Sequence, residues 1–134
     1  MTDPLAASLG VEDLLIPQGA TWSVAWVYEE STDGGATRQA VNLSTGWVAR
    51  CEIRKEPRDP TVLARFHSSD QAADGRILLA ADGTVTLSLP ADASTGWTWE
   101  YGKYDVELKH PASGRVVRLM SGVARLSPEV TTGE

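Results

Sequence analysis

The chain has 134 residues and a mass of 14.4 kDa, which is the size of one ordinary domain. It is 42% hydrophobic and 22% charged, a composition typical of globular rather than disordered proteins. The single cysteine, Cys51, excludes an intramolecular disulfide and a zinc site built on several cysteines. No apolar stretch approaches the roughly 20 residues of a membrane helix, and the first residues do not resemble an export signal.

The net charge of −6 is unevenly distributed. The first 35 residues contain acids, among them Glu29 and Glu30, but no lysine or arginine, and the rest of the chain is neutral overall. This acidic quarter is either a solvated face or a docking surface for a basic partner. Nucleic acid is not an expected partner, because acids interrupt the most basic segment, residues 50–58.

Alternation of apolar and polar residues predicts strands along the whole chain, since successive side chains of a strand point to opposite faces. The first strand is expected at 11–16 and the second at 22–29, followed by a turn at 32–35. The clearest strand runs from Gly46 to Lys55 and ends before two prolines. Its expected inward residues are Trp47, Ala49, Cys51 and Ile53.

The second half continues the pattern, with shorter strands expected at 62–66, 77–79 and 85–89. Asp82-Gly83 between two alternating runs predicts a hairpin. Residues 90–95 fit one helical turn or a crossover loop. The last strands are expected around 104–108 and at 115–126, where Gly122 indicates a bulge or a close approach of another backbone segment.

Seven or eight strands without a convincing amphipathic helix predict an all-β fold, either an antiparallel two-sheet β-sandwich or a small barrel. We expect one domain at 11–127, between a flexible N-terminal arm (1–10) and a flexible C-terminal tail (128–134). The expected core residues are Trp26, Trp47, Cys51, Ile53, Leu87, Tyr104, Val106 and Leu108.

No motif for catalysis, a metal or a cofactor stands out. The chain has two histidines, and only the loop His67-Ser68-Ser69-Asp70 brings a nucleophile, a base and an acid near one another in sequence. That loop would need a distant carboxylate in a pocket to act as an enzyme site. We therefore expect a non-enzymatic protein with no cofactor and no metal.

The sequence is unusually rich in tryptophan, with five residues. Trp97, Trp99 and Tyr101 alternate near a loop and form either core or an exposed aromatic anchor for a protein or a sugar. We take this run as the preferred interface candidate. Parallel, exposed indoles would favour sugar binding, and indoles between the sheets would exclude it.

Taken in order, several segments resemble small immunoglobulin-like β-sandwich virion proteins of tailed bacteriophages, such as the N-terminal domain of baseplate upper proteins and tail-collar sandwich domains. The resemblance spans roughly Leu14 to Thr131, and the order of the segments carries it. The matching segments are LLIPQGA (14–20), VNLSTGW (41–47) with Ile53-Arg54, YDVEL (104–108), GRVVRL (114–119) and GVARLSPEVT (122–131).

The resemblance implies a non-enzymatic virion structural protein, a tail, baseplate or collar adaptor or decoration subunit. Its partners would be other virion proteins in a multi-copy assembly, formed in the host cytoplasm, without nucleic acid or membrane insertion. A carbohydrate- or host-surface-binding module and a capsid decoration protein are the alternatives.

Two expectations accompany an immunoglobulin-like fold. Tyr104 could hydrogen-bond the backbone across a corner, as tyrosine corners do. Arg115, Arg118 and Arg125 could face the acids of a neighbouring copy, such as Glu29 and Glu30.

Overall fold

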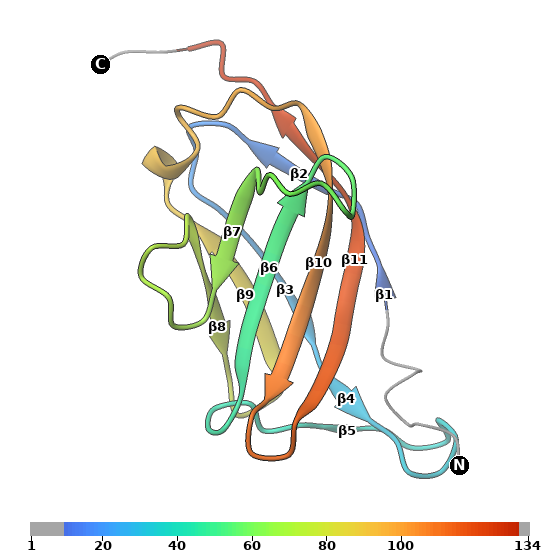
Figure 1. Cartoon of the computed structure of the whole chain (residues 1–134). Helices are drawn as coiled ribbons and strands as arrows, with labels where there is room; N and C mark the ends of the chain where they lie inside the picture. Colours follow the sequence, from blue (N-terminus) through green and yellow to red (C-terminus); the bar gives the residue numbers. More distant parts are fainter. Residues whose placement is uncertain (1–9, 132–134) are drawn as a thin grey trace.

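In the computed structural model, which describes residues 10–131, the chain forms eleven β-strands and one short 3₁₀ helix (Figure 1). In chain order they are β1 (Gly10–Val11), β2 (Leu14–Pro17), β3 (Trp22–Val27), β4 (Glu29–Glu30), β5 (Gln39–Ala40), β6 (Val48–Arg54), β7 (Ala64–His67), β8 (Gly75–Leu79), β9 (Thr84–Leu89), η2 (Ala91–Ala93), β10 (Tyr101–His110) and β11 (Arg115–Ser127). Within residues 10–131 no helix is long and apolar enough to cross a membrane.

Nine strands belong to one hydrogen-bonded sheet in the order β1-β11-β10-β6-β7-β8-β9-β3, with β2 also paired to β11, and β4 and β5 form a separate ribbon. The sheet folds back on itself between β7 and β8, which share only two residue pairs. A Cβ atom at Gly75, at this fold, would lie 2.4 Å from the ring of Phe66. Glycine therefore lets the two layers join closely there.

The expectation of seven or eight strands in two antiparallel sheets needs correction. The fold is all-β and sandwich-like, but one continuous sheet supplies both layers, and three of its pairings are parallel: β1 with β11, β2 with β11 and β7 with β8. Strands of two to four residues, such as β1, β4 and β5, are too short to show alternation. The parallel pairs arise from tertiary contacts that a local pattern does not encode.

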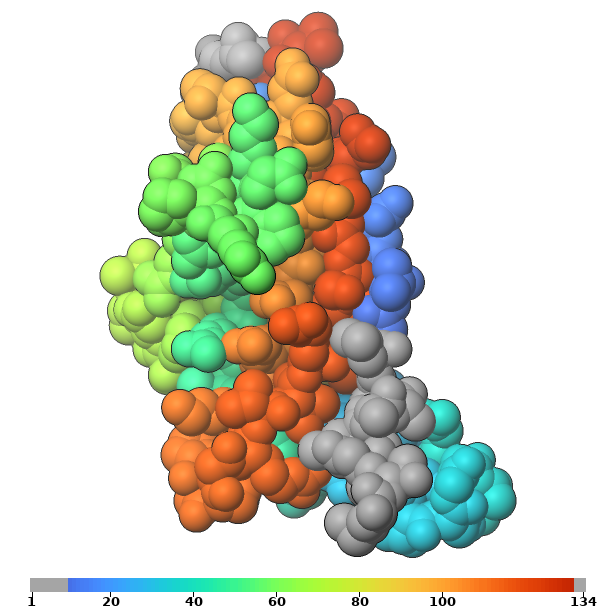
Figure 2. All heavy atoms as spheres, turned by 45° about the vertical axis from the view of Figure 1, so that its right-hand side comes forward, coloured from blue at the N-terminus to red at the C-terminus, as the bar shows by residue number. Residues whose placement is uncertain are grey.

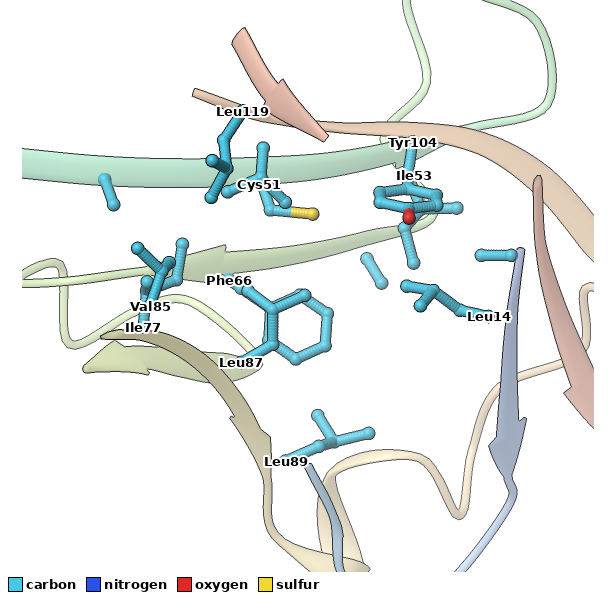
Figure 3. Packing of buried hydrophobic residues seen from close by; sticks show 14 of the residues in the cluster. Leu14, Cys51, Ile53, Phe66, Ile77, Val85, Leu87, Leu89, Tyr104 and Leu119 are labelled. Carbon is cyan, nitrogen blue, oxygen red and sulfur yellow. The ribbon is translucent and has the colours of Figure 1, made fainter. Parts of the chain in front are cut away.

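The core lies between the two layers and is apolar (Figure 3). Of the expected core residues, Cys51, Ile53, Leu87, Tyr104, Val106 and Leu108 are buried. Burying one such leucine contributes about 1.5–3 kcal/mol. Burial also raises the pKa of the Cys51 thiol, which keeps it protonated and unreactive.

Trp26 and Trp47, also expected in the core, are only half-buried, and both pack against the buried cluster from its margin. The indole Nε1 of Trp26 lies 3.4 Å from the Glu12 carboxylate. Trp47 precedes β6 and packs at the end of the sandwich against Tyr28 and His110. Both rings pack against the margin of the core. Each has a polar group beside it, the Glu12 carboxylate for Trp26 and the His110 ring for Trp47.

The N-terminal segment bends between β1 and β2, where two hydrogen bonds and a close backbone approach hold the bend. The Tyr104 hydroxyl donates to the Glu12 carbonyl at 2.6 Å, and the Val123 amide donates to the Asp13 carboxylate at 3.1 Å. A Cβ atom at Gly122 would lie 2.2 Å from the Glu12 carbonyl oxygen, so the expected close backbone approach is confirmed. Tyr104 thus bonds a backbone carbonyl, although its partner is this N-terminal bend and not a corner between later strands.

Gln18 ties three segments together at one end of the sandwich. Its side-chain amide donates to the carbonyls of Ser94 and Trp97 at 3.1 and 2.8 Å, and its side-chain oxygen accepts from the Glu129 amide at 3.2 Å. The neighbouring Gly19 amide donates to the buried Ser94 hydroxyl at 2.7 Å. The residues after β11 therefore begin anchored to the turn after β2.

Replacing Tyr104 by phenylalanine should lower the free energy of unfolding by about 0.5–1.5 kcal/mol, because the Glu12 carbonyl loses its donor. Urea unfolding followed by tryptophan fluorescence measures this difference. Tyr101→Phe, at an exposed ring in the same strand, is the matched control and should change nothing. Equal stability of Tyr104→Phe and the control would show that the bend does not depend on this bond.

Candidate functional site

The outer face of β6, β10 and β11 carries a groove of about 650 Å³. Figure 2 shows β10 and β11, in orange and red, between the green segment after β6 and the blue β1 and β2. Alternation builds the groove, because the apolar residues of each strand point into the core and leave the polar ones outside. Its charged lining residues are Asp13, Arg50, Glu52, Arg54, Lys103, Asp105, Glu107 and Arg118.

The register of β6 against β10 places like charges opposite one another at two positions, although Arg65 on β7 lies on the other side of Glu52. Glu52 on β6 lies opposite Asp105 on β10, and Arg54 lies opposite Lys103. Directly opposed side chains on one face are about 5 Å apart, and like charges in that position are destabilising. The groove floor therefore has an acidic row next to a basic row, two residues apart along the strands.

A third row is better matched. Glu107 lies between Arg50 on β6 and Arg118 on β11, and Arg50 Nε donates to its carboxylate at 2.9 Å. The two unfavourable rows are thus a local feature and not a general property of this face.

Neighbouring arginines relieve the acidic row only in part. Arg54 and Arg65 pair with Glu52 at 2.9 and 3.7 Å, whereas Asp105 has only Arg118, at 3.5 Å. Partial burial, followed by the charge of Glu107, raises the pKa of Asp105, and Glu52 adds to this effect. Asp105 is therefore a carboxylate whose charge the free protein does not fully compensate.

Lys103 is the corresponding cation of the basic row. It is exposed, and it makes no ion pair with the residues that the structure describes. Arg54, opposite it, is already bonded to Glu52 and to the Asp59 carbonyl. An anion placed over this row would meet Lys103 first.

The aromatic run 97–101 leads into the start of β10, two residues before Lys103. The rings of Trp97 and Trp99 are 5.3 Å apart and tilted by 37°, and both are half-buried against the core, while Tyr101 is exposed. A small hollow of about 190 Å³ lies beside Trp99 and Tyr101, and the buried Trp99 Nε1 has no hydrogen-bond partner among residues 10–131. The indoles are neither parallel nor fully exposed, so this run does not form a flat stacking platform.

The expected charge interface is partly used inside the chain. Arg115 donates to the Glu30 carboxylate at 2.7 Å and lies 5.7 Å from the Trp47 ring, and Arg118 pairs with Asp105. Strand pairing brings the partners of Arg115 and Arg118 close within one molecule, and contacts of Arg115, Arg118 or Glu30 with a neighbouring copy stay a prediction. Glu29 lies beside them in the β4–β5 ribbon, and Arg125 lies 5.9 Å from the Tyr101 ring.

The loop 67–70 is organised by local hydrogen bonds. The His67 Nδ1 atom accepts from the amides of Ser69 and Asp70, at 3.0 and 2.9 Å. The Asp70 carboxylate accepts from the Ala72 amide and from Arg65, and these bonds lower its pKa. Asp70 and His67 are thus engaged with the loop's own backbone. No group of three potential metal ligands occurs within residues 10–131.

No protein-family model matches the chain, and no curated protein matches it by sequence. Among the 120 matching chains of solved structures is the NK cell receptor Nkp44, described as a triggering partner in natural cytotoxicity. It is 16% identical to this chain, covers 88% of this chain and 97% of its own length, and gives a TM-score of 0.50. This likeness shows the fold alone: all-β, sandwich-like and similar to an immunoglobulin-like domain.

The sequence analysis missed the groove residues Glu52, Lys103 and Asp105. Both acids alternate with buried residues, so their outward direction follows from the pattern, but the pattern does not show which charges lie opposite them. The missing information was the register of β6 against β10, which decides whether opposite or like charges meet. The core residues could have indicated this register. If Cys51 pairs with Val106 on the buried face, antiparallel pairing places Glu52 opposite Asp105 on the outer face.

Replacing Asp105 by asparagine should raise the free energy of unfolding at neutral pH by about 0.2–1 kcal/mol, because one like-charge contact disappears. Since the folded state raises the pKa of Asp105, its charge costs stability above that pKa, and the cost vanishes below the ordinary value of 3.8. The gap between variant and wild type should therefore close on acidification. Urea unfolding of both proteins across this pH range measures it.

Glu107→Gln is the matched control, with the same loss of one charge on the same strand. Glu107 also repels Asp105, but it pairs directly with Arg50 at 2.9 Å and lies opposite Arg118, so its replacement should leave stability unchanged or lower it. An Asp105→Asn variant that is less stable than wild type at neutral pH would contradict the electrostatic description of the groove.

Proposed function

We propose that this chain is a non-enzymatic assembly protein that docks on a partner protein through the groove of β6, β10 and β11. In the context that the sequence resemblance implies, it is a structural subunit of a tailed-phage particle, associated with the tail, baseplate or collar. The groove recognises a segment that brings a cation to the Glu52–Asp105 row and a carboxylate to the Arg54–Lys103 row.

One observation carries the proposal: two adjacent like-charge rows lie on the floor of one groove. Such local conflicts with stability are expected where a ligand completes the charge pattern. A partner that pairs both rows gains charge-assisted hydrogen bonds and also relieves the repulsion, so its binding is favoured twice.

The spacing indicates the form of the partner. The two rows are two residues apart along β10, which is about 7 Å in an extended strand. An extended protein segment has the same spacing between residues i and i+2. A basic and an acidic residue two positions apart therefore match the groove, and a protein surface is the class of ligand that offers both signs in this geometry.

The structural neighbour is compatible with a recognition role. Nkp44 is described as a receptor and a triggering partner, which is a binding function on a fold of the same kind. Fold likeness at this identity does not assign a partner, so the groove itself must be tested.

The charge exchange Lys103→Glu with Asp105→Lys tests the groove at constant net charge. Each new side chain faces an opposite charge across the strands, so the variant should be more stable than wild type and yet unable to dock. In particles of the phage that encodes the chain, quantitative mass spectrometry should find wild type as a stoichiometric component and the variant reduced at least about tenfold.

The control is a second exchange at constant charge, Lys109→Glu with Glu56→Lys, at exposed positions outside the groove. It should enter particles like wild type. Incorporation of the groove variant at the wild-type level would refute docking through the groove. Absence of the wild-type chain from purified particles would refute the assignment to a virion.

A further inference from the structure

The strand β3 ends the sheet on one side, and its outer edge has no partner among the strands that the structure describes. An open edge is a row of unpaired N–H and C=O groups that can pair with another strand, and proteins usually protect it. The other end of the sheet shows such protection. There the chain bends at Glu12–Asp13 between two short strands, and β2 ends in Pro17.

The hydrogen-bond pattern identifies the open groups. Tyr28 donates to the Gly83 carbonyl at 2.8 Å, directly after β3, and hydrogen-bonded pairs alternate along an antiparallel ladder. Trp22, Val24 and Trp26 therefore bond to β9. Ser23, Ala25 and Val27 direct their N–H and C=O groups away from β9, toward the open edge.

The strand itself carries no charge against edge pairing, and the Glu12 carboxylate lies against the Trp26 indole at 3.4 Å. The six residues of β3 contain no charge, and the side chains of Ser23, Ala25 and Val27 are exposed, with Val27 at 54%. The outward residues of the neighbouring β9 are Thr84, Thr86 and Ser88, which are also uncharged. Neither lysine nor proline, the usual devices against edge pairing, occurs in this strand.

We propose that two copies of this chain pair through β3, antiparallel and about a two-fold axis at Ala25. This register places Ala25 opposite Ala25 of the second copy and Ser23 opposite its Val27, so that all three open residues of each strand are used. With two hydrogen bonds in each such pair, the interface has six. Registers centred on Val24 or Trp26 leave one open residue of each strand unpaired and form four.

The side chains fit the same register. On the outer face, alanine at the two-fold axis allows the closest approach, because the smallest side chain meets its own copy. On the inner face, Trp26 meets Val24 of the second copy, and both side chains are only half-buried in a single molecule. The interface is isologous, since each contact occurs twice, and it joins two three-stranded layers into one six-stranded layer.

The occupant is a second copy and not an unrelated strand, because the edge is self-complementary. The strand β3 carries no charge, so two copies of it can pair without charge repulsion between the strands. Its smallest open residue, Ala25, lies midway between the other two, Ser23 and Val27. The interface lies on the layer of β3, β8 and β9, apart from the groove of β6, β10 and β11, so the dimer and the proposed docking can each fail alone.

Sedimentation of the purified full chain over a wide concentration range tests the dimer. Wild type should approach twice 14.4 kDa on concentration. Ala25→Glu places two carboxylates face to face at the axis and should raise the dissociation constant at least about tenfold. Leu78→Glu, also exposed on this layer but two strands from the edge, is the control and should dimerise like wild type.

Amide hydrogen exchange by NMR tests which groups are involved. The amides of Trp22, Val24 and Trp26 should be protected at every concentration, because they bond to β9. Those of Ser23, Ala25 and Val27 should be protected only in the dimer. The Ala25→Glu variant, checked for its fold by circular dichroism, should lose the second set of protections and keep the first.

Paired charges test the register. Ser23→Lys with Val27→Glu gives two attractive pairs across the axis and should dimerise, whereas Ser23→Lys with Val27→Lys gives two repulsive pairs and should stay monomeric. The groove exchange Lys103→Glu with Asp105→Lys should dimerise like wild type. A wild-type monomer at all concentrations, or a dimer insensitive to Ala25→Glu, would overturn the proposal.

Discussion

The register of β6 against β10 is the constraint on which the outer face of the molecule depends. On the inside, Cys51 meets Val106 and Ile53 meets Tyr104, and these apolar contacts fix the pairing. Because side chains alternate, the same register puts Glu52 opposite Asp105 outside the core. A slip of one residue would separate the like charges but would also turn the core residues to solvent. The core thus imposes an unfavourable charge pattern that the surface could not adopt by itself.

The closure of the sandwich adds a second constraint at the N-terminal segment. The bend at Glu12–Asp13 needs the absence of a side chain at Gly122 and the hydroxyl of Tyr104. It brings Val11 and Asp13 to one wall of the groove, opposite Pro57 in the loop after β6. A structural requirement of the fold therefore also shapes the proposed docking site. The open edge of β3 lies on the opposite layer, where the described residues provide no comparable bend or proline.

The sequence predicted the features that depend on local pattern. The all-β class, the strand from 46 to 55, the turn at Asp82-Gly83 and the close approach at Gly122 all follow from alternation or from glycine. The continuity of the sheet, its parallel pairs and the registers could not be predicted, because they depend on contacts between distant segments. The charged residues of the groove were visible as outward residues, but only the register shows which of them oppose one another. For the same reason, the sequence alone does not show that Arg115 and Glu30 meet within one chain.

A double-mutant cycle between Glu52 and Asp105 tests the central claim most directly. The free energy of unfolding is measured in urea at neutral pH and low salt for wild type, Glu52→Gln, Asp105→Asn and the double variant. The account predicts a repulsive coupling of about 0.2–1 kcal/mol that weakens in high salt. A coupling of zero, or an attractive one, would contradict it.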